Sequence, residues 1–209
     1  MKVVQVIKRL NNTELGKAGM HDTYVLIPNE LEISDIFDTS GIPIEFTDKV
    51  TQKKVTVKNT VGREKRIAGL GEYYRANNLC AGDEIIFERR DMHGRSEYYI
   101  GVRKYPDLLA FRKLENGYEI LTPERIDKIV EATALMEQKV EVNFLRSAKK
   151  RKDSPESTDY YSILISGISI SDLYSVRGVC GIQVSGSGIH FVDSFGWKKY
   201  IFEMEEEVS

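Results

Sequence analysis

The sequence predicts a mainly β protein with short helices: an open barrel followed by a second, strand-rich α+β region. Short runs rich in Val, Ile, Tyr and Phe are bounded by Gly, Pro, Asn and Asp, which is the pattern of strands joined by turns. One or two short helical segments fit between these runs, a combination typical of closed or partly open β-barrels. Of the 209 residues, 41% are hydrophobic and 30% are charged, which indicates a folded protein with a core.

The first half of the chain supplies the barrel. Residues 91–95, Asp-Met-His-Gly-Arg, predict a hairpin turn between the last two expected strands. Ser34–Phe37 and Gly71–Asn77 fit short helices, and Asn77-Asn78 stops the second one. The expected strands are Val3–Leu10, Tyr24–Pro28, Ile42–Phe46, Lys53–Val57, Glu84–Glu88 and Glu97–Arg103.

A domain border is expected at Lys104–Asp107, where a proline coincides with a change in charge. Residues 1–104 contain 17 Lys and Arg against 15 Asp and Glu, a charge of +2, whereas residues 105–209 contain 13 against 17, a charge of −4. We therefore expect a first domain over 1–104 and an α+β region of unknown role over 105–209. The overall charge of −2 neither supports nor excludes a nucleic-acid partner, because binding needs local positive charge.

The second region contains one clear helix, expected over about 122–137. Thr122 can cap its N-terminus, Pro123 suits the first helical position, and Glu124 and Asp127 complement the helix dipole. An apolar face follows at helical spacing. The expected strands of this region are Val140–Leu145, Tyr160–Ile170, Gly178–Val184, Gly188–Val192 and Lys198–Met204.

A polar break interrupts Val6–Pro28 between two strand patterns. Loops that only close a hairpin have about two to five residues, so this longer break suggests a recognition arm. Its amides, hydroxyl, cations, imidazole and carboxylate can contact base edges and phosphates of nucleic acid. The candidate residues in this break are Asn11, Asn12, Thr13, Lys17, His21 and Asp22. Lys8 and Arg9 are further candidates on the strand before it, where they lie on opposite faces, so only one of them can point to a partner.

A second polar arm is expected within Asn59–Gly71, where four charged residues follow one another: Arg63, Glu64, Lys65 and Arg66. An arginine can bind guanine O6 and N7 with two hydrogen bonds, and a lysine can neutralise a phosphate. Glu64 can accept from cytosine N4 or hold a neighbouring arginine in its rotamer. The alternative is an ordinary solvated run of charges.

The order of these motifs resembles the DNA-recognition domain of EcoRII-type restriction endonucleases, and more broadly the B-three pseudobarrel domain shared with plant transcription factors. The resemblance covers about residues 1–104. Its elements are the IKRL strand start, the G-x-x-G-x-H arm at Gly16–His21, the EKRI sequence and the run Leu79–Glu88. Gly62 and Arg63 depart from the EcoRII pattern, so the base sequence that would be recognised stays open.

The resemblance implies a seven-stranded open barrel that holds the major groove between two arms, Lys8–Asp22 and Arg63–Arg66. It implies sequence-specific binding of double-stranded DNA by the target-recognition module of a bacterial restriction-modification system. Cleavage would come from a separate nuclease domain or subunit, and binding itself would need no cofactor. We also expect a cytoplasmic protein with no membrane contact, because no apolar run approaches the roughly twenty residues of a membrane span, and the N-terminus does not resemble a secretion signal.

Two other functions remain open. Pro106-Asp107 followed by Glu137-Gln138-Lys139 imitates the motif of magnesium-dependent nucleases, in which carboxylates hold Mg²⁺ and a lysine positions water. The whole expected helix separates its two halves, which makes the motif weak evidence for a restriction endonuclease with its own catalytic centre. In the third hypothesis, both arms bind a protein partner.

Overall fold

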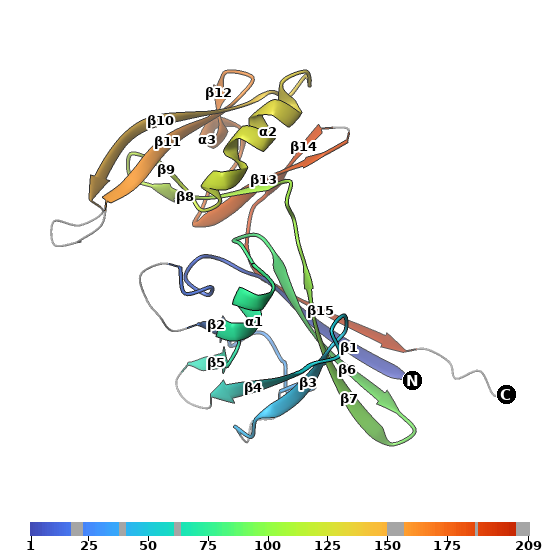
Figure 1. Ribbon diagram of the computed structural model, residues 1–209. Helices are drawn as coiled ribbons and strands as arrows, with labels where there is room; N and C mark the ends of the chain where they lie inside the picture. The colour runs from blue at the N-terminus through green and yellow to red at the C-terminus, as the bar shows by residue number, and fades with distance from the viewer. Residues whose placement is uncertain (18–22, 38–40, 61–63, 150–156, 187, 204–209) are drawn as a thin grey trace. The chain divides into compact units, whose positions relative to one another are not determined.

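The structure, a computed structural model, describes residues 1–17, 23–37, 41–60, 64–149, 157–186 and 188–203. Its contacts divide the chain into two compact units. Unit 1 comprises Met1–Lys104 and Gly196–Ser209, and unit 2 comprises Tyr105–Phe195. Figure 1 shows the strands and helices of the two units. Each unit has its own hydrophobic core. In the described part of the chain, no helix has the length and hydrophobicity that a membrane span needs.

Unit 1 is built on one eight-stranded sheet with the order β15-β1-β6-β7-β3-β4-β5-β2. The sheet curls into a half-barrel, which confirms the predicted open pseudobarrel. All its pairs are antiparallel except β3 with β7, and the short helix α1 (Gly71–Ala76) follows β5. The strands are β1 (Lys2–Arg9), β2 (Tyr24–Ile27), β3 (Ile44–Asp48), β4 (Lys54–Thr60), β5 (Lys65–Ala68), β6 (Glu84–Met92), β7 (Arg95–Arg103) and β15 (Trp197–Glu203).

The concave side of this sheet holds the core of unit 1. Alternate residues of each strand point to it, because side chains in a strand alternate between the two faces. Three aromatic rings, of Phe37, Phe46 and Phe87, lie at its centre with centroids 5.1–5.7 Å apart. Burying each such ring contributes roughly 1.5–3 kcal/mol.

Several features of unit 1 differ from the sequence analysis. β15 comes from the end of the chain, which we had placed with 105–209, and it pairs with β1 over Lys2–Lys8. β5 was not expected, because its four residues begin inside a charged run. In contrast, Ser34–Phe37 forms the single turn that was expected, closed by hydrogen bonds from the amides of Ile36 and Phe37 to the Ile33 carbonyl.

Unit 2 contains a sheet with the order β10-β11-β9-β8-β13-β14, and β12 pairs with β11. The α+β composition agrees with the predicted second region. Its strands are β8 (Leu108–Leu114), β9 (Gly117–Ile120), β10 (Val140–Lys149), β11 (Ser157–Ile165), β12 (Ile168–Ser169), β13 (Val179–Ser185) and β14 (Gly188–Val192). Its helices are η1 (Pro123–Arg125), α2 (Ile126–Thr133) and α3 (Ile170–Leu173).

The helix expected over 122–137 is shorter in the structure. Thr133 ends α2: its hydroxyl donates to the Ile129 carbonyl and accepts from the Val140 amide at 3.0 Å, which ties the helix end to β10. The Thr122 hydroxyl accepts from the Ala110 amide at 2.9 Å instead of capping the helix. Hydrogen bonds to neighbouring strands therefore involve the threonine hydroxyl at each end of this helical segment.

Candidate nucleic-acid interface

The first two residues expected in the first arm, Lys8 and Arg9, lie inside unit 1. Lys8 is 4% exposed and Arg9 is 9% exposed. The Lys8 ammonium forms an ion pair with Glu14 at 3.0 Å and donates to the Arg9 carbonyl, and the Arg9 guanidinium donates to Glu84 at 2.9 Å. Both cations are used internally, so the expectation that either contacts DNA is not retained.

Burial dominates the electrostatics of the Lys8–Glu14 pair. It lowers the pKa of the Lys8 ammonium, and the Glu14 charge offsets only part of that effect. It likewise raises the pKa of the Glu14 carboxyl, against the attraction of Lys8 and a hydrogen bond from the Asn11 amide. The two buried charges face each other, so the pair positions the chain that follows β1.

The described part of the arm itself is a compact turn. The Asn11 amide donates to a Glu14 carboxylate oxygen at 2.9 Å, and the Glu14 amide donates back to the Asn11 side-chain oxygen at 3.0 Å. This reciprocal pair is the capping-box arrangement, which fixes the direction in which the chain leaves β1. Asn11 is therefore a structural residue of the arm.

Three other candidates of this arm are placed closer to the surface. Thr13 and Lys17 are exposed and Asn12 is half-buried. The Lys17 ammonium donates to the Leu79 carbonyl at 2.9 Å, which ties the arm to the segment after α1. His21 and Asp22 lie outside the described residues.

The second arm leads into β5. Glu64 and Lys65 are exposed and Arg66 is half-buried, whereas Arg63 lies outside the described residues. The Arg66 guanidinium forms an ion pair with Glu64, with its Nε 3.1 Å from the carboxylate, and stacks over the Tyr24 ring at 4.2 Å from the centroid. Of the two roles considered for Glu64, this geometry corresponds to holding a neighbouring arginine in its rotamer.

Strand pairing brings the two arms to opposite ends of one pair of strands. β2 and β5 are antiparallel, with Tyr24 opposite Ala68 and Ile27 opposite Lys65. The first arm enters β2 at Tyr24, and the second arm enters β5 at Lys65. A four-residue strand spans about 13 Å, on the order of the width of the DNA major groove, about 12 Å.

Between the arms lies the convex side of β2, β5 and β4, which we call the outer face. Figure 1 shows β5 between β2 and β4 at the side of unit 1. The register places Leu26, Arg66 and Thr60 in one row and Tyr24, Ala68 and Lys58 in the next. The outer face consists of Tyr24, Leu26, Lys54, Thr56, Lys58, Thr60, Arg66 and Ala68.

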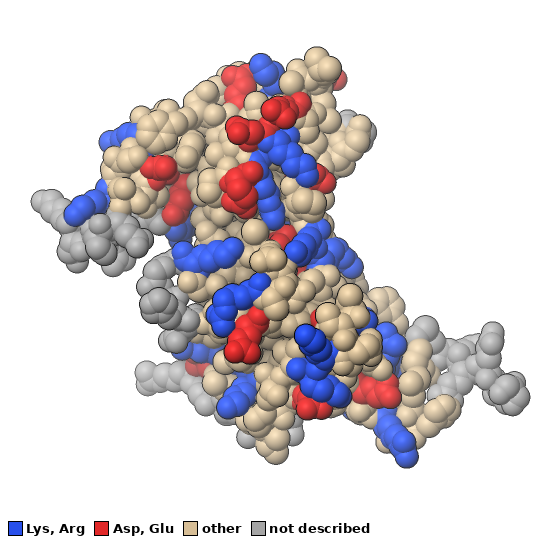
Figure 2. Space-filling view, viewed as in Figure 1, with Lys and Arg blue, Asp and Glu red and all other residues tan. Residues whose placement is uncertain are grey.

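The charges of the outer face are only partly neutralised. Lys54 forms an ion pair with Glu45 at 3.2 Å, and Arg66 is paired with Glu64. Lys58 is exposed and has no ion-pair partner among the described residues. The same holds for Lys65 of the second arm, which lies on the other face of β5 together with Ile67. On the side shown in Figure 2, lysine and arginine side chains are scattered over unit 1, with fewer carboxylates among them.

Sequence reasoning missed the β4 part of this surface. Lys54, Thr56, Lys58 and Thr60 alternate with less exposed residues, which is the pattern of a strand with one polar face. Because the expected strand ended at Val57, Lys58 and Thr60 were not recognised as part of that pattern.

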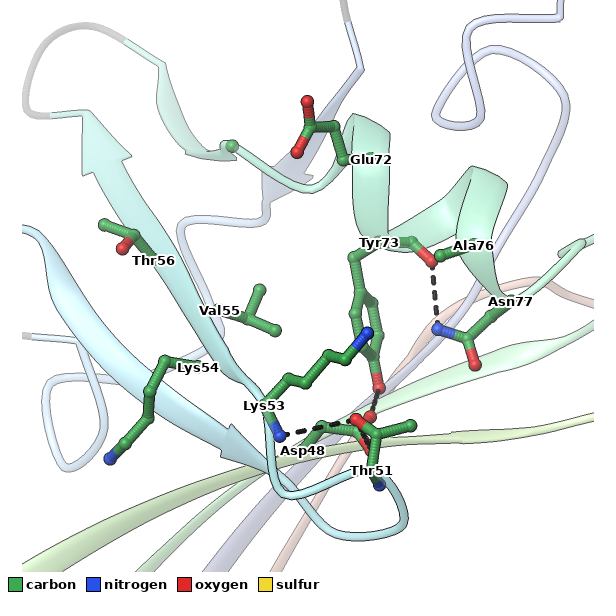
Figure 3. Close-up of a pocket in the computed structure, with 11 residues that line it drawn as sticks. Asp48, Thr51, Lys53, Lys54, Val55, Thr56, Glu72, Tyr73, Ala76 and Asn77 are labelled. Carbon is green, nitrogen blue, oxygen red and sulfur yellow. Dashed lines mark hydrogen bonds between the residues drawn. The ribbon is translucent and has the colours of Figure 1, made fainter.

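A hollow of about 640 Å³ lies between the start of β4 and α1 (Figure 3). At its base, the Tyr73 hydroxyl donates to Asp48 at 2.6 Å, and the Val50 and Thr51 amides donate to the same carboxylate. Although burial raises the pKa of Asp48, the hydrogen bonds led by the Thr51 amide bring it below its ordinary value. The carboxylate is satisfied and ionised, so it anchors the β3–β4 turn and is not suited to proton transfer.

In unit 2, the residues of the nuclease-like motif make contacts with other residues of the unit. Asp107 is about half exposed and forms an ion pair with Lys128 at 2.7 Å. The Lys139 amide donates to the Ser166 hydroxyl, and the Glu137 carbonyl accepts from the same hydroxyl. Among the described residues, no cluster of three or more His, Cys, Asp or Glu side chains could hold a metal ion.

No protein family and no curated protein matches this chain. Two solved structures are similar to part of it. The Arabidopsis FUS3–DNA complex, a plant B-three domain, is 22% identical over 47% of this chain and 94% of that chain, with a TM-score of 0.35. The N-terminal domain of Helicobacter pylori LlaJI.R1 is 14% identical over 50% of this chain and 82% of that chain, with a TM-score of 0.34. The fold assignment of unit 1 depends on its own strand order and curled sheet.

Proposed function

We propose that unit 1 binds double-stranded DNA in a sequence-specific manner, as the target-recognition module of a bacterial restriction system. In this proposal the outer face lies against the major groove and the two arms contact the groove from either end. Binding needs no metal, and cleavage belongs to a separate nuclease domain or subunit that would use Mg²⁺. The names of the two similar structures, a DNA complex and a LlaJI restriction protein domain, agree with this proposal.

The observation that carries the proposal is the position of the outer face between the entries of both arms. A surface about 13 Å long, with exposed Lys58 on it and exposed Lys65 in the adjoining second arm, matches a groove lined by phosphates on both sides. The hydroxyls of Thr56 and Thr60 add hydrogen-bonding groups between the cations.

Arg66 is the residue that we assign to base recognition. Its guanidinium is held by Glu64 and by the Tyr24 ring, so it loses little conformational freedom when it forms two hydrogen bonds to guanine. Lys58 and Lys65 are assigned to phosphates, because flexible ammonium groups neutralise charge without selecting a base.

The experiment is selection of duplexes from a randomised pool, followed by binding measurements on single base-pair variants of the selected site. Arg66→Ala should relax the preference at one base pair by about 1–3 kcal/mol while leaving the other positions unchanged. Arg95→Ala, an exposed arginine in the β6–β7 hairpin, is the matched control and should leave the selected sequence unaltered.

Two results would contradict this assignment. If no sequence is enriched, unit 1 is not a sequence-specific DNA-binding module. If Arg66→Ala and Arg95→Ala select the same site with equal stringency, base recognition does not depend on Arg66. A protein-interaction module would instead bind its partner with an affinity that is insensitive to salt.

A further inference from the structure

β15 leaves one edge of the unit 1 sheet open. It pairs with β1 along one side and ends the strand order, and no other described strand pairs with it. An edge strand presents unpaired amide and carbonyl groups, and proteins normally protect such an edge with charged side chains, prolines or bulges.

This edge carries large apolar side chains instead. Tyr200, Ile201 and Phe202 are 43%, 51% and 46% exposed. The rings of Tyr200 and Phe202 are stacked on one face of the strand, with centroids 6.2 Å apart and an angle of 14° between their planes. Ile201 lies on the other face. Three consecutive exposed apolar residues on an open edge indicate a surface that another strand covers.

The sequence of the edge is complementary to itself. If an antiparallel copy of β15 is centred on Ile201, Lys199 faces Glu203, Tyr200 faces Phe202, and Ile201 faces its own counterpart. Directly opposed residues of an antiparallel pair share one face of the sheet, so the four aromatic rings gather on one face and the two isoleucines meet on the other.

The two charged residues that this register brings together, Lys199 and Glu203, are also able to form an ion pair. The Lys199 ammonium already donates to the Glu32 carbonyl at 2.7 Å and to Asp35. An ammonium group has three donors, so one remains for the Glu203 carboxylate of a second copy. Glu203 has no ion-pair partner among the described residues.

We propose that β15 pairs antiparallel with β15 of a second copy of this chain, which joins two unit 1 sheets into one continuous sheet. The two-fold axis passes beside Ile201, so each contact occurs twice. A five-residue edge contact is small, and the dimer therefore dissociates on dilution. This proposal does not depend on DNA binding.

The first test is sedimentation of the full chain, without DNA, from low to high micromolar protein concentration. The wild type should shift from monomer to dimer. Ile201→Lys should remain monomeric, because it sets two ammonium groups opposite each other at the axis while changing only a half-exposed side chain. Leu135→Lys is the matched control: it changes a fully exposed leucine outside β15 and should dimerise like the wild type. A wild type that is monomeric throughout, or an Ile201→Lys variant that dimerises normally, would overturn the proposal.

The second test fixes the register. Under mild oxidation in a Cys80→Ser background, Ile201→Cys should form a disulfide-linked dimer, because the two residues at position 201 face each other. Tyr200→Cys should not, because residue 200 faces residue 202 of the second copy. Equal cross-linking of both variants, or of neither, would contradict this register.

Discussion

The buried Lys8–Glu14 pair allows a sharp test of how the first arm is held. In Lys8→Met, the Glu14 carboxylate stays buried without its cation, and breaking such a pair costs about 3–5 kcal/mol. With an m value of about 2 kcal/mol/M, that loss lowers the urea midpoint of unit 1 by roughly 2 M.

Unfolding of unit 1 can be followed separately, because the single tryptophan of the chain, Trp197, lies in it. The double variant Lys8→Met/Glu14→Gln removes both charges and keeps an oxygen that can accept from the Asn11 amide. It should recover most of the lost stability, so the double-mutant cycle should give a coupling of more than about 1 kcal/mol. If Lys8→Met costs less than about 1 kcal/mol, Lys8 is not a buried structural cation and its exclusion from the interface is wrong.

Three further predictions concern stability and use the same tryptophan fluorescence. Tyr74→Phe should leave the free energy of unfolding unchanged or raise it, because the buried Tyr74 hydroxyl has no hydrogen-bond partner among the described residues. Tyr73→Phe loses the hydrogen bond to Asp48 and should lower the free energy of unfolding by about 1–2 kcal/mol. A larger loss in Tyr74→Phe than in Tyr73→Phe would contradict these contacts. Burial raises the pKa of the Glu88 carboxyl, but its hydrogen bonds, above all the one from Lys49, bring the pKa below its ordinary value of 4.5. Glu88→Gln should therefore lower the free energy of unfolding at neutral pH, and its difference from the wild type should shrink as pH falls below about 4.5. A difference that does not change with pH would contradict this prediction. Gly69→Ala should lower the free energy of unfolding by more than about 1 kcal/mol, since φ is +90° and the new Cβ would lie 2.9 Å from the Thr56 carbonyl oxygen. A neutral result would show that the β5–α1 connection does not pack this closely against β4.

The local pattern of the sequence predicted much of unit 1. The apolar runs of β1 and β6, rich in Val and Ile, and the turn at His93-Gly94 are local features of the sequence, so they could be predicted from it. β15 was predicted as a strand over Lys198–Met204, but its place in unit 1 could not be predicted, because its partner β1 lies about two hundred residues earlier in the chain. β5 was missed because its strand character depends on its two neighbours.

The candidate site was predicted less well than the fold. Lys8 and Arg9 look like surface cations in the sequence, and only the tertiary structure places Glu14 and Glu84 beside them. In contrast, Glu64 and Arg66 are two residues apart on one strand face, so their pairing follows from local geometry. Contacts between residues close together in the sequence could therefore be predicted from it, whereas the burial of charged side chains could not.

The most direct test of the central claim is the salt dependence of DNA binding by the full chain. For a selected duplex, the logarithm of the binding constant should fall linearly with the logarithm of salt concentration, and Lys58→Ala/Lys65→Ala should reduce the slope by about 2. Lys113→Ala, an exposed lysine of unit 2, serves as the control and should leave the slope unchanged. An unchanged slope in the double variant would contradict the assignment of the outer face and the second arm as the DNA-binding surface.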